Sequence, residues 1–194
     1  MARGVAEVMA DYRLDAELWC EGRSPWLRAS LTGYLVYAGL RHLADPAYRS
    51  WFAGITLGFH ELGHLVFAGL GHTMMLLGGS LLQLLAPAAA GLYLLLRQGV
   101  HFGAAVGGSW FAFASWELAT YVYDAPREDL PLVGFGDHPQ HDWGTLLTEW
   151  GVLNAADNYA AVIRGVATLS WLTSVALATW LCVVMWRLGR AARA

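Results

Sequence analysis

Residues 51–71 read WFAGITLGFHELGHLVFAGLG, and Glu61 is the only formally charged residue among them. About twenty consecutive apolar residues are enough for a helix to cross the hydrocarbon core of a bilayer. The segment therefore predicts a membrane helix. An acidic side chain near the centre of such a helix costs about 3 kcal/mol or more, so Glu61, flanked by His60 and His64, indicates a functional site.

The composition of the whole chain agrees with this interpretation. Hydrophobic residues make up 57% of the 194 positions and charged residues only 14%, whereas soluble domains contain about 25% charged residues. All twelve cationic residues are arginines, and the net charge of −3 excludes the basic surface that binds nucleic acid. Cys20 and Cys182 lie far apart and offer no metal-ligand spacing, so we expect both to be packing residues.

The apolar runs predict an all-α fold, a polytopic transmembrane helical bundle of about five spans. The expected spans are residues 26–44, 51–71, 73–96, 99–123 and 160–186. We expect one integral-membrane domain over 1–194, divided into an interfacial amphipathic helix (1–25), four spans (26–123), a polar loop with an amphipathic segment (124–157) and the last span (158–187). Five alternating spans would place the two termini on opposite sides of the membrane.

The five residues 60–64 form an HExxH motif. On a helix, His60 and His64 lie one above the other on the same face, so both imidazoles can bind one Zn²⁺. Glu61 then projects beside the metal, where a general base for the attacking water is needed. The motif predicts a hydrolytic zinc site with His60 and His64 as metal ligands and Glu61 as the catalytic residue.

A catalytic zinc needs a third protein ligand, and the sequence offers three candidates. His141 is preferred, in the polar stretch GDHPQHDW at 136–143, with Asp142 orienting a ligand. Glu117, a second carboxylate within an apolar run, comes next. Asp142 is third, with His141 then donating a hydrogen bond to a developing oxyanion. The alternative for this stretch is a solvated acidic turn in which Asp142 caps the following helix.

The third predicted span carries two polar residues on one helix face. Ser80 and Gln83 lie three positions apart, next to Gly78 and Gly79, and are candidates for binding a peptide substrate. The alternative is that Gln83 forms a hydrogen bond to a neighbouring helix, which is the commoner role of a single glutamine in a span.

The motif at 60–64 resembles that of intramembrane zinc metalloproteases of the site-2 protease type. The resemblance implies zinc at His60 and His64, with Glu61 as the base. The chain is also similar to a group of small bacterial membrane proteins that share HExxH, a GGSLLQL-like segment (here 78–84) and a His-Asp-Trp segment (here 141–143), which implies the bacterial cytoplasmic membrane. Site-2 proteases take their third ligand from the Asp of an LDG or NPxDG motif, which this chain lacks.

These observations predict a zinc-dependent membrane-embedded metallopeptidase, with Zn²⁺ as cofactor and a membrane protein or peptide as substrate. The alternative is a non-enzymatic membrane metal-binding or transport protein that uses the histidines as a relay. Another possibility is a structural membrane protein in which HExxH is incidental. Three measurements distinguish these functions. Loss of cleavage in Glu61→Gln would support the peptidase, and metal uptake that survives this change would support the transport protein. Absence of zinc from the purified protein would support the structural protein.

Overall fold

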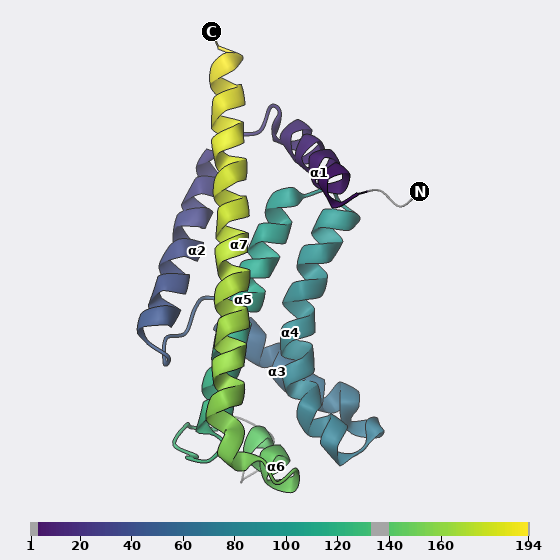
Figure 1. Cartoon of the computed structure of the whole chain (residues 1–194), viewed down its shortest axis with the longest axis vertical. Coiled ribbons are helices and arrows are strands. Elements are labelled where there is room, and N and C mark those ends of the chain that lie inside the picture. The colour runs from purple at the N-terminus through teal and green to yellow at the C-terminus, as the bar shows by residue number, and fades with distance from the viewer. Residues whose placement is uncertain (1–3, 133–139, 194) are drawn as a thin grey trace.

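The structure, a computed structural model, describes residues 4–132 and 140–193, and this part of the chain is helical and contains no strand. The all-α prediction is confirmed. The elements are α1 (Val5–Cys20), α2 (Trp26–Ala44), α3 (Ala53–Phe67), the 3₁₀ turn η1 (Ala68–Leu70), α4 (His72–Leu96), α5 (His101–Asp124), α6 (Asp142–Glu149), the 3₁₀ turn η2 (Leu153–Ala155) and α7 (Ala156–Ala191) (Figure 1).

Helix α5 lies at the centre of the bundle and packs mainly against α7 and α4 (Figure 1). Small residues allow the close approach of α4: a Cβ atom on Gly107 would lie 2.5 Å from Gly91 Cα, and one on Gly103 would lie 2.7 Å from a Leu94 methyl carbon. On the other side, Phe113 and Trp171 bury their rings between α5, α7 and α2. The core therefore consists of helix–helix contacts along α5.

The prediction of five membrane spans is not confirmed. Within the described residues, two helical segments are long and apolar enough to cross a membrane, His72–Leu96 and Leu153–Ala191. Helix α3 contains 15 residues, fewer than the roughly 20 that a span needs. Helix α5 has the length of a span but is not among these two apolar segments. Most of its residues are buried by other helices, so its composition does not have to suit contact with lipid.

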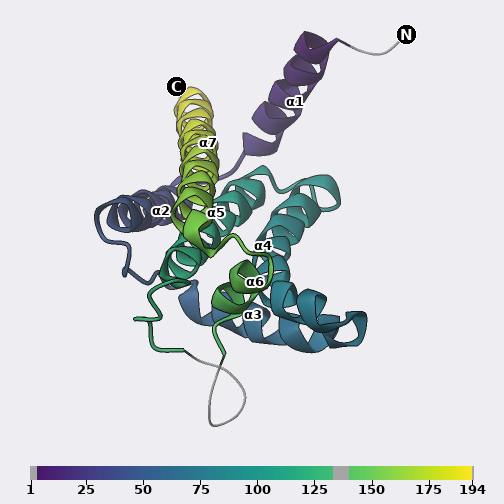
Figure 2. The same cartoon turned by 60° about the horizontal axis from the view of Figure 1, so that its bottom comes forward.

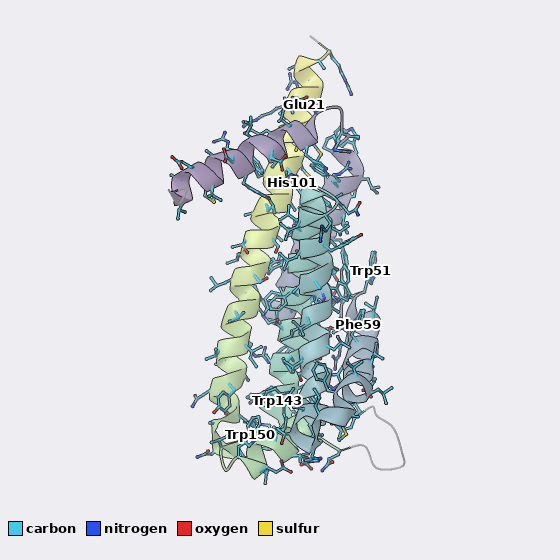
Figure 3. The ribbon with its side chains drawn as sticks, turned by 90° about the vertical axis from the view of Figure 1, so that its right-hand side faces the viewer. Glu21, Trp51, Phe59, His101, Trp143 and Trp150 are labelled. Carbon is cyan, nitrogen blue, oxygen red and sulfur yellow. The ribbon has the colours of Figure 1, made fainter. Side chains whose placement is uncertain are left out.

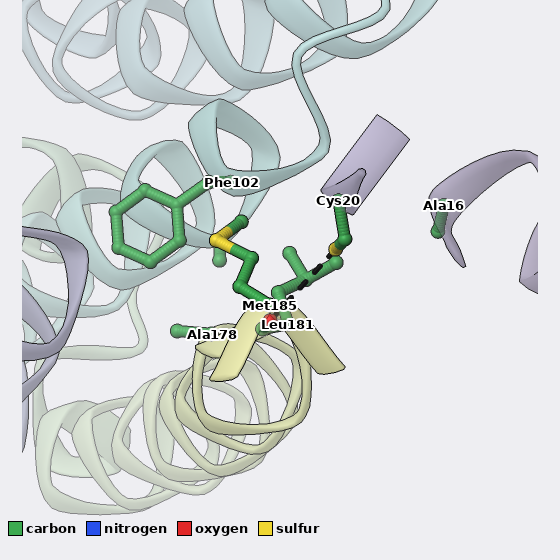
Figure 4. Close-up of a cluster of buried hydrophobic side chains, with 7 residues drawn as sticks. Ala16, Cys20, Phe102, Ala178, Leu181 and Met185 are labelled. Carbon is green, nitrogen blue, oxygen red and sulfur yellow. Dashed lines mark hydrogen bonds between the residues drawn. The ribbon is translucent and has the colours of Figure 1, made fainter. Parts of the chain in front are cut away.

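Helix α1 lies crosswise at one end of the bundle (Figures 2 and 3). The Nε2 atom of His101, at the start of α5, lies 3.1 Å from Asp15 Oδ2. Cys20 is buried with Leu181 and Met185, and its thiol lies 3.8 Å from the Leu181 carbonyl oxygen (Figure 4). The interpretation of Cys20 as a packing residue agrees with this contact.

Both ends of the chain lie at the α1 end of the molecule (Figure 1). Helices α2 and α3 run one after the other away from this end, and α4, α5 and α7 then alternate in direction. Five alternating spans would put the ends on opposite sides, so this part of the prediction differs from the structure. The reason is that α2 and α3 together make one passage along the bundle. Helix α6, with Trp143 and Trp150, lies at the opposite end (Figure 3).

Candidate metal centre

The HExxH helix α3 crosses α4 at a contact between glycines. A Cβ atom on Gly63 would lie 2.1 Å from the Gly78 carbonyl oxygen, and one on Gly78 would lie 2.7 Å from the Gly63 carbonyl oxygen. One residue further along α4, a Cβ atom on Gly79 would lie 2.7 Å from the His64 ring and 2.9 Å from the His60 ring. The glycines therefore bring the backbone of α4 directly against both histidines, leaving no room for any larger residue.

His60 is oriented by a chain of hydrogen bonds that begins on α5. The Gln83 amide nitrogen donates to the Ala114 carbonyl oxygen at 2.8 Å, so the Gln83 Oε1 atom is the acceptor that faces His60 Nδ1 at 2.9 Å. Because Oε1 only accepts, His60 Nδ1 carries the proton. In a neutral ring, Nε2 then has a free electron pair. This is how neighbouring groups orient histidine ligands of metals.

His64 is oriented in the same way by the backbone of α4. Its Nδ1 atom lies 2.9 Å from the Met75 carbonyl oxygen, which only accepts, so Nδ1 is again the donor. The Nε2 atoms of His60 and His64 lie 3.1 Å and 3.4 Å from the same Asp142 oxygen, Oδ2. Ligand atoms bound to a tetrahedral zinc at 2.0–2.1 Å lie roughly 3.3 Å apart, so these two spacings suit such a site.

Asp142, the first residue of α6, is placed by contacts with α5 and α4. Its backbone N–H donates to the Tyr121 hydroxyl oxygen at 2.9 Å, and the hydroxyl lies 3.4 Å from Oδ2. The next residue, Trp143, donates from its indole nitrogen to Ser80 Oγ at 2.9 Å. Burial raises the pKa of Asp142, but the contacts with the two histidines outweigh it and hold the pKa below its ordinary value. The carboxylate is therefore ionised at neutral pH.

His141, the preferred third ligand in the sequence prediction, has a different role. Its Nδ1 atom accepts the Gly144 N–H at 3.0 Å, so His141 itself caps α6, and not Asp142 as the alternative prediction had it. Burial lowers the pKa of His141, and the proton of the neutral ring then sits on Nε2, 3.5 Å from Asp124 Oδ2. Stacked on Tyr121 at 4.2 Å between ring centres, the ring offers no free electron pair to a metal.

The geometry therefore favours Asp142, the last of the three candidates for the third ligand, over His141 and Glu117. His60, His64 and Asp142 form a group whose ligand atoms all lie within 4.8 Å of one another and that could hold a metal ion. Glu117 does not belong to it. Asp137 and His138, two further polar residues of this loop, lie outside the described residues.

Ser80 and Gln83, which the sequence predicts to bind a peptide substrate, form hydrogen bonds within the protein instead. Gln83 uses its amide nitrogen and oxygen on Ala114 and His60, and the Ser80 hydroxyl accepts from Trp143. Both residues therefore hold the metal site together. For Gln83, the alternative of a hydrogen bond to a neighbouring helix describes the structure.

A cavity of about 380 Å³ adjoins the metal group. His60 and Glu61 line it from α3, and Glu117 and Tyr121 line it from α5, one helical turn apart. Leu130 and neighbouring residues of the loop that follows α5 close another side. The cavity is large enough for a short segment of a ligand, and both Glu61 and His60, one of the candidate metal ligands, line it.

Tyr121 is the residue of this site that the sequence prediction missed. Its hydroxyl accepts the Asp142 N–H and donates to Asp142 Oδ2, and the residue is one of those that line the cavity. A sequence signal existed, because Tyr121 follows Glu117 by four residues and precedes Asp124 by three, which puts three polar groups on one face of an otherwise apolar helix.

The donor set suits a divalent transition metal. Two imidazole nitrogens and one carboxylate oxygen form the kind of three-residue set that binds catalytic zinc, whereas Mg²⁺ and Ca²⁺ prefer oxygen ligands only. With both Nδ1 protons committed to acceptors, the two Nε2 atoms and the carboxylate repel one another unless the rings bind extra protons or one cation lies between them.

Comparison with known proteins gives no match to a protein-family model, to a curated protein or to a solved structure.

Proposed function

We propose that the protein is a zinc-dependent, membrane-embedded metallopeptidase that hydrolyses a peptide bond of a membrane protein or peptide. The observation that carries the proposal is the proton arrangement at the candidate centre: His60 and His64 each donate from Nδ1 and turn Nε2 toward Asp142, next to a cavity lined by Glu61. A set of two histidines and one aspartate is also the set that the resemblance to site-2 proteases implies, although here Asp142 starts a short helix without an LDG motif.

Zinc bound at this centre would supply a water of lowered pKa, about 7, and would polarise the substrate carbonyl. In the proposed mechanism Glu61 takes the proton of the attacking water and returns it to the leaving amine. Tyr121 lines the cavity, and its hydroxyl, which donates to Asp142 Oδ2 at 3.4 Å in the structure, would turn this proton to the developing oxyanion. Asp142 and the histidines bind the metal.

The proposed location is a membrane, with the α1 end facing the cytoplasm. Support comes from α4 and the α7 region, which are long and apolar enough to span, and from exposed apolar residues such as Leu65 and Leu169 on the outer faces of the bundle. Arginine near span ends favours the cytoplasmic side. The arginines at the α1 end are Arg13, Arg23, Arg28, Arg97, Arg187, Arg190 and Arg193.

One matched pair of variants and one further variant test the metal assignment. His64→Gln is expected to lose zinc, whereas His72→Gln, an exposed position at the start of α4, is expected to keep one zinc per chain. Asp142→Asn should weaken binding strongly, because it removes the charged ligand. Zinc is measured by elemental analysis of protein purified in detergent. Wild-type protein that contains no zinc after incubation with zinc and removal of the excess would refute the proposal.

The catalytic part is tested with Glu61→Gln. This variant is expected to keep its zinc and to lose cleavage of apolar peptides presented in detergent or in vesicles, because the amide cannot accept a proton. Undiminished turnover would exclude Glu61 as the base. Metal transport into vesicles by wild type and by Glu61→Gln alike would instead favour the non-enzymatic alternative.

A further inference from the structure

Glu117 is a buried carboxylate that the proposed mechanism does not use. It lies on the central helix α5 and is only 9% exposed. Its Oε1 atom is buried without a hydrogen-bond partner among the described residues, and no cationic side chain of this part of the chain lies within 4.0 Å of it. A buried carboxyl group with no partner is destabilising by several kcal/mol, so its presence calls for an explanation.

The position of Glu117 relates it to the cavity. The residue lines the same cavity as His60 and Glu61, and it precedes Tyr121 by four residues, or about 6 Å along the helix axis. A ligand group that occupies this part of the cavity would lie against the carboxylate while the rest of the ligand reaches the metal group.

The charged side chains that line the cavity indicate whether this ligand group is positively or negatively charged. Among the lining residues, Glu61 and Glu117 are acidic and Arg49 is the single cation. Arg49 is exposed, and it interacts with Glu117 only at a distance longer than an ion pair. The lining therefore carries two acidic side chains against one cation, and that cation is exposed, which favours a positively charged ligand.

We propose that Glu117 is the anchor for a cationic group of the substrate, a primary ammonium. The ammonium could belong to a free amino terminus or to a lysine side chain, since both present three N–H donors to a carboxylate. An ammonium in this place would satisfy the unpartnered oxygen by a charge-assisted hydrogen bond. This inference rests on the proposed peptidase function and adds the class of substrate to it.

Cleavage of three forms of one internally quenched apolar peptide tests the inference. The forms are N-acetylated and neutral, with a free amino terminus, and N-acetylated with one lysine. We expect one of the two cationic forms to have a kcat/KM about 10- to 100-fold above the neutral form, the range of a hydrogen bond to a charged group. The form that gains identifies the source of the ammonium.

The ratio of cationic to neutral kcat/KM is then compared among variants. In Glu117→Gln the ratio is expected to fall to about one, through an increased KM of the cationic peptide. The matched control is Glu149→Gln, an exposed position on α6 outside the cavity, which should keep the wild-type ratio. Equal ratios in wild type and Glu117→Gln, or no preference for either cationic form in wild type, would overturn the inference.

A binding measurement separates this inference from the peptidase function. Dicyclohexylcarbodiimide, an apolar reagent for buried carboxyl groups, is applied to the zinc-loaded protein, and the peptide containing Glu117 is followed by mass spectrometry. Leucinamide, which carries an ammonium, is expected to reduce labelling at least tenfold more than N-acetyl-leucinamide, which does not. If wild type cleaves no peptide yet shows this protection, the peptidase proposal fails and the cation site remains. Equal effects of the two amides overturn the cation site, whether or not peptides are cleaved.

Discussion

Replacement of Gly79 by alanine is expected to damage the metal centre through a single methyl group. In the structure, a Cβ atom at this position would lie 2.7 Å from the His64 ring and 2.9 Å from the His60 ring. Ordinary van der Waals contact begins at about 3.4 Å, so the His64 ring or the backbone of α4 must move by about 0.7 Å. Metal–ligand distances tolerate only about 0.2 Å of error.

The effect of Gly79→Ala can be estimated for both the free energy of unfolding and the zinc affinity. Overpacking costs about 1–3 kcal/mol, and the better helix propensity of alanine returns about 0.5–1 kcal/mol, so the metal-free protein loses about 0–2.5 kcal/mol. Because both histidines are displaced, zinc affinity is expected to fall about 100-fold, at the upper end of the effects known for groups that orient ligands.

Competition with a chromophoric zinc chelator of known affinity measures this effect, and thermal unfolding of the metal-free protein measures the stability. The control is Gly58→Ala on α3, where a Cβ atom would meet nothing within 4 Å; this variant should bind zinc as wild type does. If Gly79→Ala binds zinc with wild-type affinity, then the two rings do not lie against α4 as described. The Nδ1 protonation of His60 and His64, which depends on those contacts, would then be wrong as well.

Three further variants or conditions probe neighbouring parts of the centre. Gln83→Leu removes the acceptor of the His60 Nδ1 proton, so zinc affinity should fall about 10- to 100-fold in the chelator assay; an unchanged affinity would contradict the orienting role. Tyr121→Phe should keep stoichiometric zinc but lower kcat about 100-fold, and a kcat equal to that of wild type would exclude it as the oxyanion donor. Zinc binding should weaken as the pH falls, because protons compete for two histidine nitrogens. Since the pKa of Asp142 is held below its ordinary value, only the two histidines add protons in this range, and we expect log Kd to rise by about 2 for each unit by which the pH is lowered below the histidine pKa; a slope near zero would place the metal elsewhere.

Helix boundaries were the most predictable part of the fold. The run at 26–44 coincides with α2, and the runs at 73–96 and 99–123 differ from α4 and α5 by at most two residues at either end. Each run is followed by a charged residue, and Gly99, between α4 and α5, takes up a left-handed conformation with φ 61°, so local chemistry determines where the helices stop.

The number of passages through the bundle could not be read from the same pattern. Residues 51–71 have the composition of a full span, yet the helix within them covers only Ala53–Phe67 and continues the direction of α2. Composition reports how apolar a segment is, but the direction of a helix depends on the turn before it and on which neighbours it packs against. Here Tyr34, on α2, accepts a hydrogen bond from the Trp51 backbone and stacks on its ring, which sets the start of α3 beside α2.

The third candidate ligand could not be predicted from the sequence for a related reason. His141 and Asp142 are adjacent in the sequence and equally suitable chemically, and only the start of α6 between them decides which side chain faces α3. Because the His141 ring caps the helix and accepts the Gly144 N–H, it is turned toward Asp124, while Asp142 is turned toward His60. The capping preference of a single position thus selects which side chain joins the candidate metal group.

Helix α4 explains why three separate sequence segments belong to one site. A histidine that binds a metal through Nε2 is oriented by an acceptor for its Nδ1 proton, and α4 supplies both acceptors, the Gln83 side chain and the Met75 carbonyl. It can do so only because Gly78 and Gly79 let it approach α3 at backbone contact. Ser80, on the same helix, holds Trp143 and therefore the aspartate beside it. An HExxH helix without such a partner would present two histidines of undetermined tautomer, so the glycine-rich segment is as much a part of the metal site as the ligands are.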